Sequence, residues 1–399
     1  MKTILFTAEL GAGLGHIMPL LRIADAMRAR LAARGEAPFR AIFVLHDPHH
    51  IRPHLIAGDL ALAAPRPTSL GKIRSHTASF AEILALAGFA RSDDLLAGLA
   101  AWDDIFALCT PDAIIADHSP LAVLAARGRI PTLVTGNAFN APPAQIKHYP
   151  ALLAGTDAPP IQQTMLATVN AALRGRALPE IAALPHFMQG DARAVFMLPM
   201  FDPYGPLRDT PLLGTYENGI VPLAPPSAPG IFIYGHSNLA LTRRIVQASV
   251  STGLPVVAHL TGGETESTHF LKRQGAEVLT NLPDVADVFP RVSVVVSHAG
   301  AGLSQSAFAA GRPQVVVPIH SESQMIARQI VKLGTGFCLD PTDGDIDTAT
   351  LGDAIRRAAT DPAMMQAAAA QAGAVSRLGL PADPLGLAAE MALGLASRA

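Results

Sequence analysis

The stretch VSHAGAGLSQSAFAAGRPQVVVPIH, residues 296–320, places a glycine-rich turn between two runs of valine. An apolar run ends at Val296, the turn carries Gly300 and Gly302, and apolar residues at 303, 307 and 310 then follow a helical spacing. A second valine run closes the stretch at Pro318. This order predicts a strand, a helix and a parallel strand beside the first, which is the repeating unit of an α/β sheet.

The turn in this unit is a candidate anion site. A helix that starts at the carboxyl end of a parallel strand presents unpaired N–H groups, and glycines let a phosphate approach the backbone. A turn that only connects the strand to the helix and binds no ligand fits the spacing about equally well. His298 would add a side-chain donor beside Gly300 and Gly302.

The same pattern of short apolar strands and intervening helices occurs in both halves of the chain. The expected strands are residues 3–7, 41–45, 113–116, 132–135 and 194–198, then 231–235, 255–260, 277–280, 292–296 and 314–318. We therefore predict two Rossmann-like, doubly wound parallel-sheet domains facing across a cleft. The expected domains are 1–205 and 230–380, joined by a proline-rich linker at 206–229. A C-terminal helix at 381–399 is expected to pack back on the first domain.

Composition narrows the function classes. The 399 residues are 50% hydrophobic and carry a formal net charge of −2, which offers no long-range attraction to nucleic acid or an anionic membrane. Two cysteines are too few for a disulfide framework. No apolar stretch is long enough to span a membrane, and the N-terminus does not read as a signal peptide. We expect a cytoplasmic protein.

A second glycine turn, GAGLGH at residues 11–16, follows the first strand and precedes a helix with Pro19 in its first turn. The turn lacks the glycine spacing of a nicotinamide dehydrogenase, and no acidic residue closes the second strand before His46. Four histidines crowd residues 46–54, but their spacing fits no common structural zinc site, so no metal is expected.

The two motifs carry a resemblance. HAGAGLSQSAFAAGRPQVVVPIHSESQMIARQI resembles the nucleotide-sugar binding motif of family 1 glycosyltransferases of the GT-B fold, in the bacterial macrolide and flavonoid type. GLGHIMPLLRIADAMRAR resembles the N-terminal motif of the same family. The resemblance spans most of the chain but does not extend to residues 140–185, where acceptors are usually recognised.

The resemblance implies site residues. His16 would be the general base, with Asp117 as its supporting carboxylate, although a helix-capping role for Asp117 stays nearly as plausible. The expected acceptor contacts are Gly15, His46 and Asn137. The expected donor contacts are Gly235, Ser237, His298, Gly300, Gly302, Ser304, Glu322 and Ser323. Helix capping by Ser237 or Asn238 is an equal alternative to a diphosphate contact there.

Two departures from the family pattern concern the donor. Ser306 stands where the family usually has a glutamate that holds the ribose, and Glu322 is followed by Ser323 where a glutamine is usual. They leave open an altered donor or a lost activity.

The resemblance implies an inverting, metal-independent glycosyltransferase. It would move a sugar from a UDP or dTDP sugar to a hydroxyl of a small-molecule acceptor, without a further cofactor. The alternatives are a catalytically silent nucleotide-sugar binding or partner protein, or another GT-B activity such as lipid-linked sugar transfer or sugar-nucleotide epimerisation. The oligomeric state is left open.

Overall fold

The structure, a computed structural model, describes residues 1–11, 14–66, 77–153, 160–217 and 221–398. Part of the predicted glycine turn at 11–16 and part of the predicted linker therefore lie outside the described residues. The chain divides into two compact units: unit 1 comprises residues 1–218 and 381–399, and unit 2 comprises residues 219–380. The segment predicted as a linker, 206–229, is thus shared between them.

Unit 1 is built on a six-stranded parallel sheet in the order β3-β2-β1-β4-β5-β6. The strands are β1 (Thr3–Ala8), β2 (Arg40–Leu45), β3 (Leu60–Ala63), β4 (Ala113–Asp117), β5 (Thr132–Gly136) and β6 (Ala192–Val195). The order reverses between β1 and β4. In sheets of this kind, ligands bind beyond the carboxyl ends of the strands at such a reversal.

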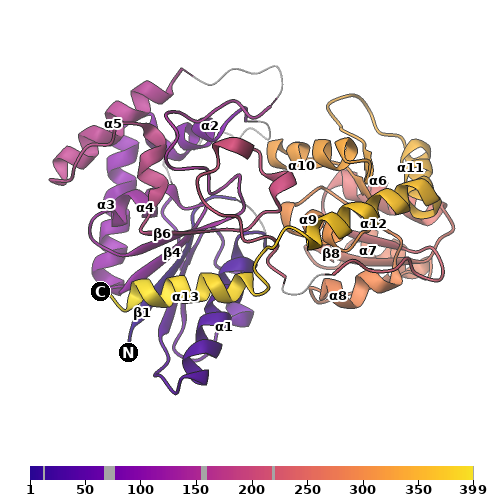
Figure 1. Cartoon of the computed structure of the whole chain (residues 1–399), viewed down its shortest axis with the longest axis horizontal. Coiled ribbons are helices and arrows are strands. Elements are labelled where there is room, and N and C mark those ends of the chain that lie inside the picture. The colour runs from indigo at the N-terminus through magenta and orange to yellow at the C-terminus, as the bar shows by residue number, and fades with distance from the viewer. Residues whose placement is uncertain (12–13, 67–76, 154–159, 218–220, 399) are drawn as a thin grey trace. The chain divides into compact units, whose positions relative to one another are not determined.

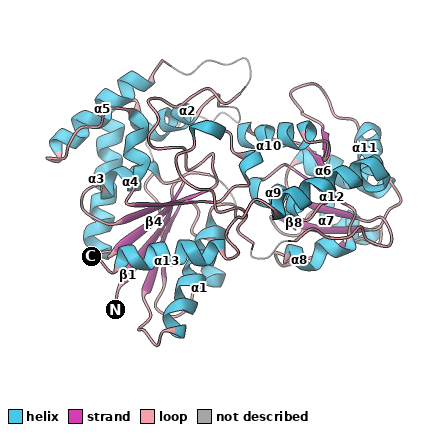
Figure 2. Ribbon diagram, viewed as in Figure 1, coloured by secondary structure: helices cyan, strands magenta, loops and turns pink. Residues whose placement is uncertain are grey.

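Helices cover both faces of this sheet (Figure 2). They are α1 (Ile17–Ala33), α2 (Phe80–Leu84), α3 (Ser92–Cys109), α4 (Pro120–Ala126), α5 (Gln162–Gly175) and α13 (Pro384–Ala396). The apolar residues of α1 at 20, 24, 27 and 31 follow a helical spacing and are buried, and Trp102 of α3 is a core residue.

The C-terminal helix α13 belongs to unit 1, where it packs beside α1 and against β4, β5 and β6 (Figure 1). Ala388, Ala389 and Ala392 are fully buried there, because small side chains let the helix approach the sheet closely. Ion pairs of Arg30 in α1 with Asp383 and Glu390 border the contact.

Unit 2 repeats the topology of unit 1, with the order β12-β11-β10-β7-β8-β9 and every pair parallel. The strands are β7 (Ile231–His236), β8 (Val256–Thr261), β9 (Glu277–Val278), β10 (Val294–Ser297), β11 (Gln314–Val316) and β12 (Gly336–Cys338). The order reverses between β7 and β10. This point corresponds to the reversal between β1 and β4 in unit 1.

The helices of unit 2 are α6 (Ala240–Ser251), α7 (Glu266–Arg273), α8 (Val285–Val288), α9 (Ala301–Ala309), α10 (Ser321–Lys332), α11 (Thr348–Thr360) and α12 (Pro362–Ser376). Apolar side chains of α6 and α11 pack with Ile231 and Val294 in one cluster, and Ala307 of α9 packs with Phe232 and Val295 in another. The two doubly wound domains expected from the sequence are confirmed. No helix within the described residues is long and apolar enough to cross a membrane.

Candidate active site

His16 and Asp117 meet where the strand order of unit 1 reverses. His16 directly precedes α1, and Asp117 is the last residue of β4, the strand beside β1. The His16 Nδ1 lies 2.9 Å from the Asp117 Oδ1. A carboxylate can only accept, so Nδ1 carries the proton and donates it, and in the neutral ring Nε2 is the basic nitrogen. The pair has the arrangement of a general base and its supporting carboxylate.

Burial shapes the electrostatics of this pair. Asp117 is fully buried, and burial raises the pKa of its carboxyl, while the charge and hydrogen bond of His16 oppose that rise. Its second oxygen has no hydrogen-bond partner among the described residues. A buried carboxylate with so few partners is stabilised most when the ring beside it is charged. The carboxylate thus favours the protonated ring that forms when His16 accepts a proton.

Asp117 does not cap α4, so the helix-capping role that the sequence left open as an alternative is wrong. The N-cap residue of α4 is Ser119, and the N–H groups of Leu121 and Ala122 donate to the carboxylate of Glu9 instead. Burial raises the pKa of Glu9 to about 8, against the lowering effect of these hydrogen bonds. Glu9 was not predicted as a site residue, because its only signal in the sequence is an acidic residue directly after a buried strand.

His118 is a second residue of this region that no sequence pattern singles out. Its ring centroid lies 5.1 Å from that of His16, and its φ of 49° is unusual for a residue with a side chain. Burial, followed by the charge of His16, lowers the pKa of His118 well below its ordinary value. His118 is therefore a neutral ring beside the candidate base.

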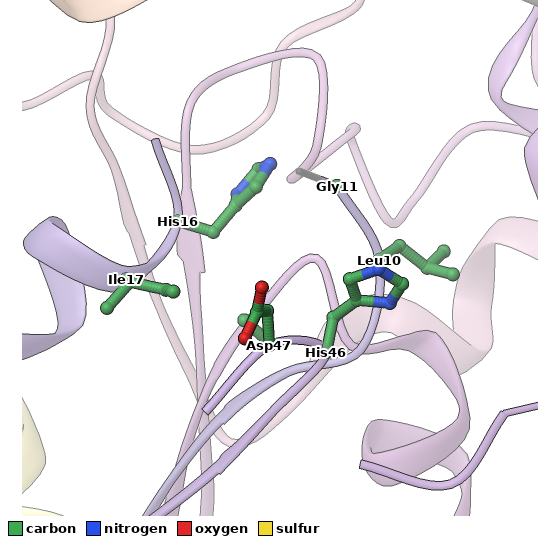
Figure 3. A pocket seen from close by; sticks show the side chains of 7 residues that line it. Leu10, Gly11, His16, Ile17, His46 and Asp47 are labelled. Carbon is green, nitrogen blue, oxygen red and sulfur yellow. The ribbon is translucent and has the colours of Figure 1, made fainter. Parts of the chain in front are cut away.

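A small pocket of about 10 Å³ lies at His16 (Figure 3). Its lining includes His46 and Asp47, which follow β2, so the structure brings the predicted residue His46 to the same place as His16. Gly11 also lines the pocket, with a φ of 93°. A Cβ on Gly11 would overlap the His16 ring, so only glycine leaves room for the ring in this position.

The other two predicted acceptor residues have different surroundings. Gly15 is exposed, and an added Cβ would meet nothing within 4 Å. Asn137 follows β5, and its Oδ1 accepts from the N–H groups of Phe139 and Asn140. This Asn turn shapes the segment after β5.

In unit 2, several of the predicted donor residues lie at the reversal between β7 and β10. Gly235 lies near the end of β7, His298 follows β10, and Gly300 is the N-cap residue of α9. An added Cβ at Gly300 or Gly302 would meet nothing within 4 Å, and no side chain caps the helix. The start of α9 thus keeps backbone N–H groups and open space, as an anion site requires.

Two serines of unit 2 are buried with no hydrogen-bond partner for the hydroxyl among the described residues: Ser237, which follows β7, and Ser304, in α9. The alternative in which Ser237 or Asn238 caps α6 is wrong, because the N-cap residue is Leu239 and no side chain caps that helix. Both serine hydroxyls lack a structural role in unit 2, which leaves them available to a ligand.

His298 does not present the free donor expected from the sequence. Its Nδ1 lies 2.9 Å from the Val317 carbonyl oxygen, which can only accept, so Nδ1 carries the proton. Nε2 lies 2.8 Å from the Thr242 hydroxyl, and burial lowers the pKa of the ring. In the neutral ring Nε2 therefore accepts from Thr242. A phosphate contact through His298 would require this bond to break.

The structure also corrects the expectation for Ser323. Its hydroxyl accepts from the N–H groups of Ile319 and His320 and donates to the His320 carbonyl, in the capping box of α10. The side chain is fully buried and serves the helix cap rather than a ligand. Glu322, in the first turn of the same helix, is half-buried.

The side chain of Ser306 is likewise hydrogen-bonded within unit 2. It is fully buried, and its hydroxyl donates to the Gly302 carbonyl oxygen one turn earlier at 3.0 Å. A glutamate at this position would place a carboxylate inside unit 2.

Among the described residues, no group of three or more histidine, cysteine or acidic side chains is placed to hold a metal ion. In the histidine-rich loop, the His50 ring lies 3.5 Å from the Asp47 carboxylate.

Comparison with known proteins agrees with this architecture. Residues 248–382 match the family described as "Erythromycin biosynthesis protein CIII-like, C-terminal domain". The elloramycin glycosyltransferase ElmGT of Streptomyces olivaceus is 28% identical over 295 residues, which cover 68% of this chain and 66% of that relative. The alignment thus spans slightly less than two thirds of its length.

Solved structures share the fold over nearly the whole chain. The calicheamicin glycosyltransferase CalG4 has a TM-score of 0.64 at 19% identity and covers 100% of this chain, with 98% of its own. The glycosyltransferase VinC in complex with dTDP has a TM-score of 0.62 at 16% identity, with full coverage of both chains. These findings agree with the resemblance drawn from the two glycine-turn motifs: residues 248–382 are similar to a family of natural-product biosynthesis proteins, and the whole chain has the GT-B fold of the bacterial natural-product glycosyltransferases that it matches.

Proposed function

We propose that this protein transfers a sugar from a nucleoside-diphosphate sugar, with UDP or dTDP as the nucleotide, to a hydroxyl of a small natural-product acceptor. The observation that carries the proposal is the hydrogen bond of 2.9 Å between His16 and the buried Asp117. The names of the relatives, which include a complex with dTDP, favour the same reaction class.

The proposed chemistry is a single displacement. The Nε2 of His16 takes the proton of the acceptor hydroxyl as its oxygen attacks the anomeric carbon of the sugar. The new carbon–oxygen bond forms on the face opposite the leaving group, and the bond from the anomeric carbon to the diphosphate breaks. One displacement inverts the anomeric configuration. Asp117 stabilises the imidazolium that His16 becomes.

The leaving diphosphate gains negative charge on its oxygens. The start of α9 offers N–H groups and the positive end of the helix dipole beside Gly300 and Gly302, and the free hydroxyls of Ser237 and Ser304 can donate as well. We propose that these groups stabilise the diphosphate without a metal ion.

A catalytically silent nucleotide-sugar binding protein is the second candidate. The side chains of His298, Ser306 and Ser323 are hydrogen-bonded within unit 2 and leave few side-chain contacts for the donor, which favours a binding protein. An intact His16 and Asp117 pair favours the enzyme, since a binding protein has no use for a general base.

Mass spectrometry of an aglycone library incubated with UDP-glucose or dTDP-glucose tests the proposal. We expect an acceptor to gain the mass of one hexose minus water, at an unchanged rate in EDTA. Nucleotide binding without any transfer would support the silent protein. A rate abolished by EDTA and restored by a divalent metal would contradict metal independence.

A further inference from the structure

Buried polar atoms without a hydrogen-bond partner are concentrated in one region of unit 1. The described part of the chain has fifteen such side-chain atoms, and eight of them belong to six residues. These residues are Asp117, His118, Asn140, Tyr149, Arg193 and Tyr204. Most buried polar groups in proteins find partners, so a local concentration of exceptions needs an explanation.

Ring contacts connect this region to the candidate base. The ring of His118 lies 5.1 Å from that of His16 and 6.1 Å from that of Phe80, and Phe80 in turn lies 5.2 Å from Tyr149. Phe139 contacts Phe80 from the segment that follows β5. Aromatic rings therefore pack beside the polar atoms of this region.

Asn140 joins the region through Asp117. An added Cβ at Gly136 would lie 2.7 Å from the Asp117 Oδ1 and 3.7 Å from the Asn140 Cβ, so the three residues are packed together. Asn140 is 1% exposed, and neither atom of its amide has a partner among the described residues. Tyr149 is fully buried, and its hydroxyl interacts electrostatically with Arg193 and Tyr204.

We call His118, Asn140, Tyr149, Arg193 and Tyr204 the unpartnered polar cluster. Its members share one capacity: each can donate a hydrogen bond from an unpartnered atom. His118 has one N–H in its neutral ring, Asn140 has its amide NH₂, and the tyrosines have their hydroxyls. Arg193 already donates to the carbonyls of Met188, Ala141 and Pro142, but its Nε does not.

We propose that the unpartnered polar cluster binds a second oxygen of the acceptor, a carbonyl or keto–enol oxygen on a flat ring system whose hydroxyl is presented to His16. A carbonyl oxygen accepts two hydrogen bonds and donates none, which matches a set of donors. The rings of Phe80, Phe139 and Tyr149 suit a flat apolar skeleton. The proposal rests on the proposed function, because it assigns the acceptor of that reaction. His118 and Asn140 are then specificity-determining residues.

Two probes of the same size isolate the carbonyl. 7-Hydroxycoumarin and 2-naphthol are both flat two-ring compounds with one phenolic hydroxyl, and only the first has a ring carbonyl. Calorimetric titration of the wild-type protein, with no nucleotide sugar present, should give at least about 10-fold tighter binding of 7-hydroxycoumarin, the effect of about one added hydrogen bond.

The variants His118→Phe and Asn140→Leu keep the size of the side chain and remove the polar atoms. We expect each to reduce the preference for 7-hydroxycoumarin to about 3-fold or less, with the affinity for 2-naphthol almost unchanged. The control is Ser249→Ala in unit 2, which removes another buried hydroxyl without a partner, far along the chain from this cluster. It should leave the preference as in the wild type.

The melting temperature gives a second readout that needs no ligand. Replacing a buried polar group that has no partner by an apolar one should leave the melting temperature unchanged or raise it. A lower melting temperature with an unchanged probe preference would show that the polar atoms serve the fold, and would overturn the proposal.

A wild-type protein that does not distinguish the probes, by binding both equally or neither, would also overturn it. Because the titration needs no sugar transfer, a protein that prefers 7-hydroxycoumarin but transfers no sugar would refute the proposed function and leave this inference standing.

Discussion

Unit 1 and unit 2 have the same strand order but use the reversal point of the sheet in different ways. In unit 1 a side-chain pair, His16 and Asp117, occupies the carboxyl edge, and both polar groups serve the candidate chemistry. In unit 2 the side chains of His298 and Ser323 are hydrogen-bonded within the fold, and the helix start of α9 offers backbone N–H groups.

This difference follows from the tasks that we propose for the two units. A proton acceptor must have a pKa near the working pH, which only a side chain provides. A diphosphate needs several donors and positive potential, which a helix start supplies without any ionisable group. We therefore expect side-chain substitutions to act most strongly in unit 1 and glycine substitutions in unit 2.

The largest expected effect is on turnover in unit 1. His16→Ala should lower kcat by about 10² or more, the usual range for a lost general base, with almost unchanged donor affinity. His49→Ala, in the exposed part of the histidine-rich loop, is the matched control and should keep its rate. Steady-state kinetics distinguish the two. An active His16→Ala variant, or one that loses donor binding instead, would show that the assigned role is wrong.

The next effect is on diphosphate affinity in unit 2. Gly302→Val should weaken dTDP binding by about 10-fold or more, because the side chain enters the space in front of the helix start. The fold should tolerate the change, since an added Cβ meets nothing within 4 Å. Gly394→Val, at a helical glycine of unit 1 with an equally open Cβ position, controls for general effects. Calorimetry and thermal unfolding should separate affinity from stability, and unchanged dTDP binding would remove the site.

A smaller effect concerns the pH dependence of stability. The pKa of His118 in unit 1 and of His298 in unit 2 is lowered by burial, so below about pH 6.5 the unfolded chain binds protons that the folded chain does not. The free energy of unfolding should therefore fall as the pH drops from about 6.5, by up to about 1.4 kcal/mol per pH unit for each group.

His118→Phe isolates one of these contributions. Glu9 acts in the opposite sense, because its raised pKa of about 8 makes the folded chain bind an extra proton below that pH. Glu9 contributes equally in both proteins, so it cancels when the free energy of unfolding of His118→Phe is subtracted from that of the wild type. Denaturant unfolding between pH 5 and 7 should give a shallower pH slope for the variant. Identical slopes would mean that His118 is protonated in the folded protein.

The smallest effect is expected for Ser323. Ser323→Ala should lower the free energy of unfolding by about 1 kcal/mol through the lost capping box, and leave dTDP affinity unchanged. Weaker dTDP binding at unchanged stability would instead assign Ser323 to the donor, as the sequence had suggested.

The sequence predicted the fold best where hydrophobic periodicity and the order of the strand and turn motifs carry the information. Valine runs separated by glycine turns predicted two parallel sheets, and the family resemblance implied the pair of His16 and Asp117, whose side chains the structure brings together. The short strands β3 and β12 were missed, because three or four residues show no period.

Hydrogen bonds between residues far apart in the sequence also could not be predicted. Nothing near His298 indicates that Thr242 and Val317 take both of its nitrogens. Glu9 caps a helix more than 100 residues away, and the cluster around His118 depends on segments from β4 to Tyr204. Such contacts are set by the fold as a whole, so local patterns do not reveal them.

Calorimetric titration of the wild-type protein with dTDP and with thymidine tests the central claim most directly. If the start of α9 binds the diphosphate, dTDP should bind at least about 10-fold more tightly than thymidine, because only dTDP brings negative charge to the helix start. Equal affinities, or no binding of either dTDP or UDP, would contradict the nucleotide-sugar site and with it the proposed transfer reaction.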